Sequence, residues 1–372
     1  MQKKIIIIFL LLTLCFTSCS NSEEAGKKQD IDNITHNVPD HYQAEISDKL
    51  NVDASVSVPQ AKEFSVLSVT KKCFDKEKVA NILFQGKVFE QGELIYQTSD
   101  GDKLYISSIE KGSFQYVTKF ATQVFHVFDY GDLNTGNREK FQEKELEGFS
   151  KDKAISKAEE LLAKLGISSF HLSEVIALDG QTMQQEQDIL LEDDYIQTLV
   201  NEGRMELKEE WGTEDACYYL VFSMHMRDIP VTQHYFTMQT IDDTLYGSSI
   251  HMLVSQNKVE GFEIHYYLYE EVGVKTEVEQ LFTMEHAIEK ANEKYGQLLL
   301  NDKYNITEVE LAYVPLKDGK SNDMYVMTPA WTMVVEIHSK GLSKDETGNL
   351  VSVDSVHNKL FLVNAVTGEE II

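Results

Sequence analysis

The sequence predicts an α+β protein with an N-terminal α+β unit followed by two tandem modules, each with a helix packed on an antiparallel sheet. Two observations predict this fold class. Segments that alternate between apolar and polar residues are followed by turn residues, which is typical of half-buried antiparallel strands. The pattern that begins at Ser150 returns at Thr283 with the same spacing, and each copy opens an apolar helical stripe.

The first 18 residues have the composition of a signal peptide. Lys3 and Lys4 precede an apolar run that extends to Phe16 and is too short to span a membrane as a mature helix. The segment 1–18 is followed by Cys19, and Phe16-Thr17-Ser18-Cys19 resembles a bacterial lipobox. This resemblance implies a diacylglycerol and palmitate anchor on Cys19. Ordinary secretion with cleavage nearby is the alternative.

Residues 19–48 are predicted to be a flexible tether, because they are polar and carry few large apolar groups near their start. Residues 49–147 follow as an N-terminal α+β domain. Strands are predicted at 51–58 and 64–70, a helix at 75–84, and further strands up to 124–128. Gly-containing turns separate the later strands, which indicates hairpins.

The first module, residues 148–275, opens with a helix that Ser150 caps. Strands are predicted at 171–178, 216–226, 229–239, 248–255 and 261–269, with a helical insertion at 181–212. The second module, residues 276–372, opens with a helix that Thr283 caps. The stripe of this helix consists of Ala287, Ile288, Ala291, Tyr295, Leu298 and Leu299. Its strands are predicted at 306–314, 329–338, 350–356 and 360–366.

The charge and the cysteines exclude several classes of function. The formal net charge of −27 opposes binding to nucleic acid, because phosphates require clustered Lys and Arg. Beyond the signal region only Cys73 and Cys217 remain, and we expect two buried free thiols. A disulfide between them is the alternative. No spacing of Cys and His indicates zinc.

The sequence contains no signature of catalysis. It has no GxSxG elbow, no HExxH motif, no Walker loop and no GxGxxG. His225, His234, His251 and His265 could converge on a metal if their strands are neighbours, but isolated histidines are the preferred interpretation. The acidic run 192–194 is interpreted as a solvated first turn of a helix. We therefore predict no catalytic residues, no metal and no cofactor.

Aromatic residues are frequent in the first module and could form a binding surface. Tyrosine gives a large contact area at a low rotamer cost, which suits protein or glycan contacts. The predicted partner-binding residues are Tyr219, Tyr235, Tyr267 and Tyr269. Because strand residues alternate between two faces, about half of the tyrosines should point inward.

The last strand ends in Asn364-Ala365-Val366-Thr367-Gly368-Glu369, after the segments 311–314 and 329–331. This order is similar to PepSY-type modules and resembles the extracytoplasmic proteins that regulate sensor histidine kinases. It also resembles an uncharacterised family of clostridial-type lipoproteins. The resemblance implies a protein-binding or inhibitory role without catalysis. In structural terms, Thr367-Gly368 is a turn, and Tyr313 and Trp331 are core residues.

Together these patterns predict a non-enzymatic lipoprotein at the extracytoplasmic face of the bacterial cell membrane. It would bind or regulate an envelope protein partner and would not bind nucleic acid. A glycan or small-ligand carrier is the first alternative, and a deep aromatic-lined cleft between the modules would favour it. A secreted hydrolase is the second, and a pocket that collects carboxylates or histidines of shifted pKa would favour it.

Overall fold

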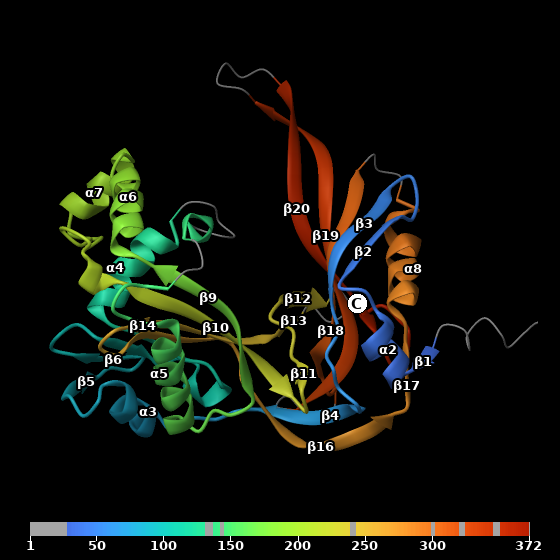
Figure 1. Cartoon of the computed structure of the whole chain (residues 1–372), viewed down its shortest axis with the longest axis horizontal. Coiled ribbons are helices and arrows are strands. Elements are labelled where there is room, and N and C mark those ends of the chain that lie inside the picture. The colour runs from blue at the N-terminus through green and yellow to red at the C-terminus, as the bar shows by residue number, and fades with distance from the viewer. Residues whose placement is uncertain are drawn as a thin grey trace, which may run out of the picture. The chain divides into compact units, whose positions relative to one another are not determined.

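The structure is a computed structural model that describes residues 28–130, 137–141, 145–238, 243–298, 302–319, 324–344 and 350–371. The predicted signal peptide and Cys19 lie outside the described residues. The fold is mixed α+β, as predicted (Figure 1). The chain forms two compact units. Unit 1 contains residues 1–66, 276–312 and 328–372, and unit 2 contains residues 67–275 and 313–327.

Unit 1 is built from segments at both ends of the chain. Its helices are α2 (Ile31–Asn37) and α8 (Met284–Tyr295). Its strands are β1 (Lys28–Asp30), β2 (His41–Glu45), β3 (Leu50–Ser57), β17 (Gln280–Phe282), most of β18 (Lys303–Lys317) and β19 (Met324–Lys344), and β20 (Leu350–Asn364). β3 pairs with β2 antiparallel and with β18 in parallel, and β20 pairs with β19 antiparallel.

The core of unit 1 follows from the two periodicities in its sequence. Leu50, Val52 and Ala54 alternate along β3 and are buried. On α8, Ala287, Ile288, Ala291 and Tyr295 are buried, whereas Leu298 lies beyond the helix and is partly exposed. Leu299, the last residue of the predicted stripe, lies outside the described residues. The ring of Tyr295 stacks on Tyr304 of β18 at 4.7 Å and meets Phe361 of β20 edge-on.

Unit 2 contains the other elements. Its helices are α3 (Lys76–Leu83), α4 (Lys119–Phe128), α5 (Lys151–Lys164), α6 (Gly180–Leu190) and α7 (Asp194–Asn201). Three 3-10 turns are η1 (Ile109–Lys111), η2 (Arg138–Lys140) and η3 (Thr213–Asp215). Its strands are most of β4 (Phe64–Lys71), β5 (Phe89–Gln91), β6 (Ile95–Thr98), β7 (Lys103–Tyr105), β8 (Gln115–Val117), β9 (Phe170–Leu178), β10 (Cys217–Met226), β11 (Ile229–Pro230), β12 (Tyr235–Met238), β13 (Asp243–Tyr246), β14 (Ser248–Ser255), β15 (Val259–Tyr266) and most of β16 (Tyr269–Val278).

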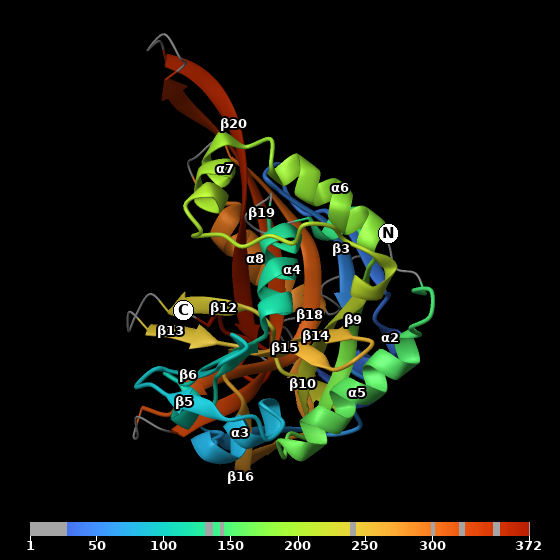
Figure 2. The same cartoon turned by 90° about the vertical axis from the view of Figure 1, so that its left-hand side faces the viewer.

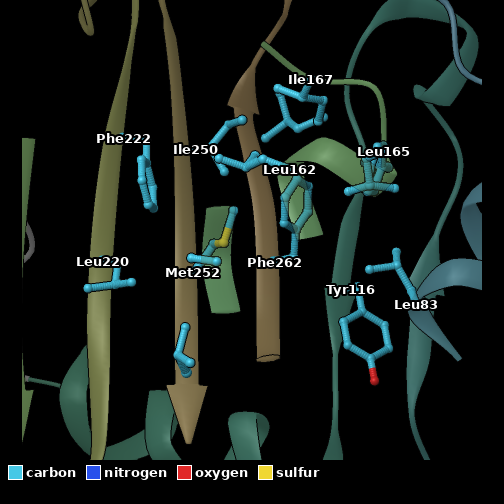
Figure 3. Close-up of a cluster of buried hydrophobic side chains, with 14 of the residues drawn as sticks. Leu83, Tyr116, Leu162, Leu165, Ile167, Leu220, Phe222, Ile250, Met252 and Phe262 are labelled. Carbon is cyan, nitrogen blue, oxygen red and sulfur yellow. The ribbon is translucent and has the colours of Figure 1, made fainter. Parts of the chain in front are cut away.

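The large sheet of unit 2 has the order β11-β10-β14-β15-β8-β7-β6-β5, and β9 also pairs with β10. Helices cover both of its faces, so β10 is buried along nearly its whole length. Side chains from α3, α5, β8, β10, β14 and β15 form one cluster, shown in Figure 3. Helices α4 and α6 lie on the other face (Figure 1). The alternate residues of the strands pack against them there.

The two units do not follow the predicted domain boundaries. The predicted N-terminal domain, 49–147, is divided, because β3 pairs with β18 in unit 1 while β8 pairs with β15 in unit 2. The predicted tether, 19–48, is wrong from Lys28 onward. There β1 pairs with β17, α2 buries Ile31 and Ile34, and β2 pairs with β3. These segments were not predicted because α2 is short and its few apolar residues give too weak a helical pattern in the sequence.

Several predicted elements are corrected by the structure. The predicted strand at 124–128 is the end of α4, where Ala121, Val124 and Val127 recur at the helical spacing. Thr118 caps this helix by accepting a hydrogen bond from the Ala121 amide. The predicted strand at 229–239 is divided into β11 and β12, the strands at 350–356 and 360–366 are one strand, and β16 was not predicted.

The helical insertion at 181–212 contains two helices. Asp193 from the acidic run caps α7, which agrees with the interpretation of that run as the first turn of a helix.

Cys73 and Cys217 are both free, and only Cys217 is buried, so the prediction of two buried thiols is wrong for Cys73. Among the described helices, none has both the length and the apolar character needed to cross a bilayer.

Candidate functional site

A concave region lined by polar and aromatic side chains lies on the face of the unit 2 sheet that α4 partly covers. In the sheet register, His251 of β14 stands opposite Glu263 of β15, and Glu263 stands opposite Gln115 of β8. Directly paired residues point to the same face, so these three side chains form one row across the strands. Tyr219 of β10 lies on this face as well and closes one end of the row.

Helix α4 ends beside this row and leaves a cleft open. Phe125 lies in its last turn, and Asp129 is its C-cap. The cleft has a volume of about 170 Å³. It is lined by Gln115, Tyr116, Val117, Phe125, Asp129, Tyr219, His251, Phe262 and Glu263. We call this feature the β14–β15 cleft. Its walls are largely aromatic, and its polar groups converge from three strands and one helix.

A chain of hydrogen bonds holds the Tyr219 side of the β14–β15 cleft. Arg138 donates from Nη2 to the Tyr219 hydroxyl at 3.1 Å, and that hydroxyl lies 2.7 Å from His251 Nδ1. Ser249 Oγ lies 3.0 Å from His251 Nε2. Since the Tyr219 oxygen already accepts from Arg138, its own proton is available to Nδ1. This assigns the proton of a neutral His251 to Nε2, which then donates to Ser249.

The electrostatics of the β14–β15 cleft follow from burial. Burial, with help from the neighbouring His265 and Arg138, lowers the pKa of His251 to about 3, so its imidazole is neutral at pH 7. Burial also raises the pKa of Tyr219 and of the Glu263 carboxyl, and the charge of Asp129 raises the latter further. Burial raises the pKa of Asp129 against the opposing effect of Arg138. As a residue, Asp129 is exposed and Glu263 is half-buried, so water screens the charge of Asp129 more than that of Glu263.

The contact between Ser249 and His251 does not have the features of a hydrolase pair. Ser249 is 1% exposed and so is out of reach of a substrate. A histidine whose pKa is near 3 is a weak general base at neutral pH, and its Nε2 proton points toward the serine. The arrangement is therefore better suited to binding a ligand by hydrogen bonds and charge than to activating a nucleophile.

The predicted tyrosine surface is only partly accessible. Tyr219 and Tyr269 are buried, so for these two residues the prediction of an exposed binding face is wrong. Tyr219 lies on the face of β10 that α4 covers, and Tyr269, the first residue of β16, packs edge-on against Tyr325. Alternation alone cannot distinguish a covered position from an exposed one. Tyr267 is half-buried, and Lys71 Nζ lies 3.5 Å from the centre of its ring. The side chain of Tyr235 lies outside the described residues.

The four predicted histidines do not form one cluster. The rings of His251 and His265 lie 5.0 Å apart, His225 stacks on His171 at 4.0 Å, and His234 is exposed. Among the residues that the structure describes, no three His, Cys, Asp or Glu side chains gather in a way that could hold a metal ion. Sequence reasoning identified His251 and His265 as strand residues but missed Glu263, which lies on the same face of β15 as His265. It also missed Asp129, the C-cap of α4, and Arg138, the first residue of η2.

The residues that carried the structural part of the resemblance are core and turn residues. Tyr313 and Trp331 are both fully buried, and Trp331 donates from Nε1 to the carbonyl of Phe282 at 2.8 Å. Gly368 has a φ of +77°, and a Cβ there would lie 2.8 Å from the ring of Phe282. The structural interpretation of these residues is confirmed.

Unit 1 has a distinctive feature of its own, a two-stranded arm formed by the far ends of β19 and β20. The far ends of these strands extend past α8 and β18 of the same unit (Figures 1 and 2). All residues from Ser352 to Lys359 of β20 are exposed, and these include Val353 at 42% and Val356 at 55%. Consecutive strand residues point to opposite faces, so both faces of this β19–β20 arm are open.

Comparison with models of known protein families gives no match, and neither does comparison with curated protein sequences. Among solved structures, the chain is similar to the crystal structure of an uncharacterized protein from Eubacterium rectale ATCC 33656. The two share 15% sequence identity with a TM-score of 0.60, over 89% of this chain and 93% of that chain. At this identity the similarity concerns the fold alone.

Proposed function

We propose that this protein is a non-enzymatic lipoprotein, anchored through Cys19 at the extracytoplasmic face of the bacterial cell membrane, that binds an envelope protein and regulates it. The signal-like segment 1–18 and the lipobox-like motif support the location. The β19–β20 arm is the observation that carries the binding role.

The β19–β20 arm supports a protein partner for two physical reasons. An isolated two-stranded ribbon in water is marginally stable, because neither of its faces is packed on a core. A partner that covers one face would bury Val353 or Val356 and add to the stability of the ribbon. The outer edge of β20 also offers backbone donors and acceptors, because among the described strands β20 pairs with β19 alone.

Site-specific photo-crosslinking tests the partner role. A photoreactive amino acid is placed at Val353 or Val356 in intact cells, and as a matched control at Val272, an exposed valine of β16 (61%). The expected result is one defined protein adduct from the arm positions and none from position 272. The absence of an adduct from both arm positions, or the same adducts from all three, would overturn the proposal.

Metabolic labelling tests the anchor independently. Cells that express the full chain are grown with an alkyne-tagged palmitate, and the protein is recovered from the membrane fraction. We expect label on the natural chain and loss of both label and membrane association in Cys19→Ala. A Cys73→Ala variant controls for acylation of the exposed thiol and should remain labelled. Labelling of Cys19→Ala would contradict lipidation at this residue.

A further inference from the structure

The β14–β15 cleft is lined by two carboxylates, those of Asp129 and Glu263, and by no Lys or Arg side chain. Neither Asp129 nor Glu263 forms an ion pair among the described residues. The nearest polar contact of Glu263 is the amide of Gln115, whose Nε2 lies 3.5 Å away. Two carboxylates that face one cleft disfavour each other's charged form, and a cation bound between them would relieve this repulsion.

The end of α4 adds to this negative potential. The helix has 10 residues, and its C-terminal end lies at Asp129, beside the cleft. The partial negative charge at a helix C-terminus favours cations. Asn137 donates to two of the terminal carbonyls, from Nδ2 to Val127 and from its backbone amide to Phe128, both at 2.9 Å. Helix and carboxylates therefore act in the same direction.

Arg138 is the one cation close to the β14–β15 cleft in the described residues, and it is engaged elsewhere. Its Nη1 lies 3.7 Å from the Glu174 carboxylate, and its Nη2 donates to Tyr219. Its guanidinium also lies 5.0 Å from the centre of the Tyr219 ring and 5.7 Å from that of Phe128. These contacts hold Arg138 beside the aromatic wall, so its charge reduces the excess without forming a contact with either lining carboxylate.

The remaining walls suit a small organic cation. Phe125 and Tyr219 present aromatic rings, which attract a desolvated cation through their π faces. His251 is neutral, so it does not repel a cation. The volume of about 170 Å³ is below the range for drug-sized ligands, so the occupant has few heavy atoms.

We propose that the β14–β15 cleft is a binding site for a small organic cation, a primary ammonium or a guanidinium, that places its charge between Asp129 and Glu263 and its apolar part against Phe125. This site is independent of the β19–β20 arm and of the lipid anchor. An anion is disfavoured by both carboxylates. A neutral monosaccharide would leave the charge excess in place, and hydrolysis would require a nucleophile that the Ser249–His251 contact does not supply.

Titration calorimetry on the full chain tests the site. The cationic probes are n-butylammonium and n-butylguanidinium. Two neutral probes serve as controls: 1-butanol has the same apolar chain, and glucose represents the monosaccharide alternative. We expect the cations to bind with a 1:1 stoichiometry and the neutral probes to give no saturable heat. Glu263→Gln and Asp129→Asn should each weaken binding of the cations by about tenfold or more, because each removes a charge-assisted contact.

Glu159→Gln is the matched control, since it removes one negative charge from an exposed position on α5 of the same unit. It should leave the affinity for the cations unchanged. Thermal unfolding without ligand separates a binding role from a structural one, because Glu263→Gln removes an uncompensated carboxylate and should raise the Tm. Binding of glucose but not of the cations would overturn the proposal, and so would a Glu263→Gln variant that binds the cations normally. A Glu263→Gln variant with a lowered Tm would assign the residue a structural role instead.

Discussion

The helix that follows Ser150 and the helix that follows Thr283 each precede three adjacent strands in the two units, although in unit 2 α6, α7, η3 and β11 to β13 lie between these strands in the sequence. In unit 2, α5 is followed by β9, β10 and β14, which lie side by side in that order, and in unit 1, α8 is followed by β18, β19 and β20, which also lie in chain order. Small residues recur on the buried stripes of both helices. The duplication inferred from the sequence stays a prediction, and the shared order agrees with it.

The sheets that follow the two helices differ in how they are covered. β10 is buried on both faces, because α5 packs on one side and α4 and α6 on the other. β20 has a long exposed segment. The pattern of a helix and three strands therefore determines the order of neighbouring strands, but it does not determine which strand faces stay exposed. In unit 2 the added helices cover the sheet and leave a cleft beside α4, and their absence from the described part of the arm leaves an open ribbon in unit 1.

Truncation of Trp331 should produce the largest loss of stability among the predicted changes, because it removes the largest buried side chain of unit 1. The indole is fully buried and donates to the Phe282 carbonyl. We expect Trp331→Ala to lower the free energy of unfolding by about 3–5 kcal/mol. Urea unfolding followed by far-UV circular dichroism measures the loss. The chain has 2 tryptophans, so the fluorescence of Trp211 then reports unit 2 alone.

The matched control for Trp331→Ala is Val356→Ala on the exposed arm of the same unit, which should change stability by less than about 0.5 kcal/mol. If Trp331→Ala costs no more than this control, the indole is not a core residue of unit 1. A Trp211 transition that moves as far as the circular dichroism transition would show that the two units unfold together.

Glu310 on β18 provides the next largest effect and has a pH dependence. Burial, assisted by the charge of Glu308, raises the pKa of Glu310 from 4.5 to about 7. The folded protein therefore holds a proton that the unfolded chain releases, and stability falls as the pH rises from about 4.5 to about 7. Glu310→Gln should leave the free energy of unfolding unchanged at pH 4 and raise it by about 2–3 kcal/mol at pH 8. Urea unfolding at both pH values tests this.

Glu279→Gln is the control for Glu310→Gln, because Glu279 is an exposed carboxylate of the same unit. It should give equal free energies of unfolding to the natural chain at both pH values, within about 0.5 kcal/mol. A gain from Glu310→Gln that is the same at pH 4 and pH 8 would contradict the raised pKa and indicate a packing effect.

Much of the fold could be predicted because the relevant signals are local. The alternation in 51–58, the Asp75 cap of α3 and the stripes of α5 and α8 each depend on neighbours within one or two turns. The division into units could not be predicted, because it depends on pairings between distant segments. β3 pairs with β18 roughly 250 residues away, and a strand carries no local mark of its partner.

The candidate site was predicted only in part, for a related reason. Alternation placed His251 and His265 on strands, and it could have added Glu263, since the three residues share a face once β14 and β15 are paired. Nothing near Asp129 or Arg138 in sequence indicates that they lie beside that face. The burial of Tyr219 and Tyr269 likewise depends on which face a helix or strand covers, and this is a tertiary property.

The caps of the two matching helices should give the smallest effects, and they test the comparison most directly. The Thr283 hydroxyl accepts from the His286 amide, whereas Ser150 makes no such bond and the Lys151 amide donates to Glu145 instead, at 2.9 Å. Thr283→Ala should cost about 0.5–1 kcal/mol in urea unfolding, and Thr283→Ser should restore most of it. Ser150→Ala should cost no more than a few tenths of a kcal/mol, less than Glu145→Gln. The opposite order at either helix would mean that the two copies are capped in the same way, and the difference described for their first turns would be wrong.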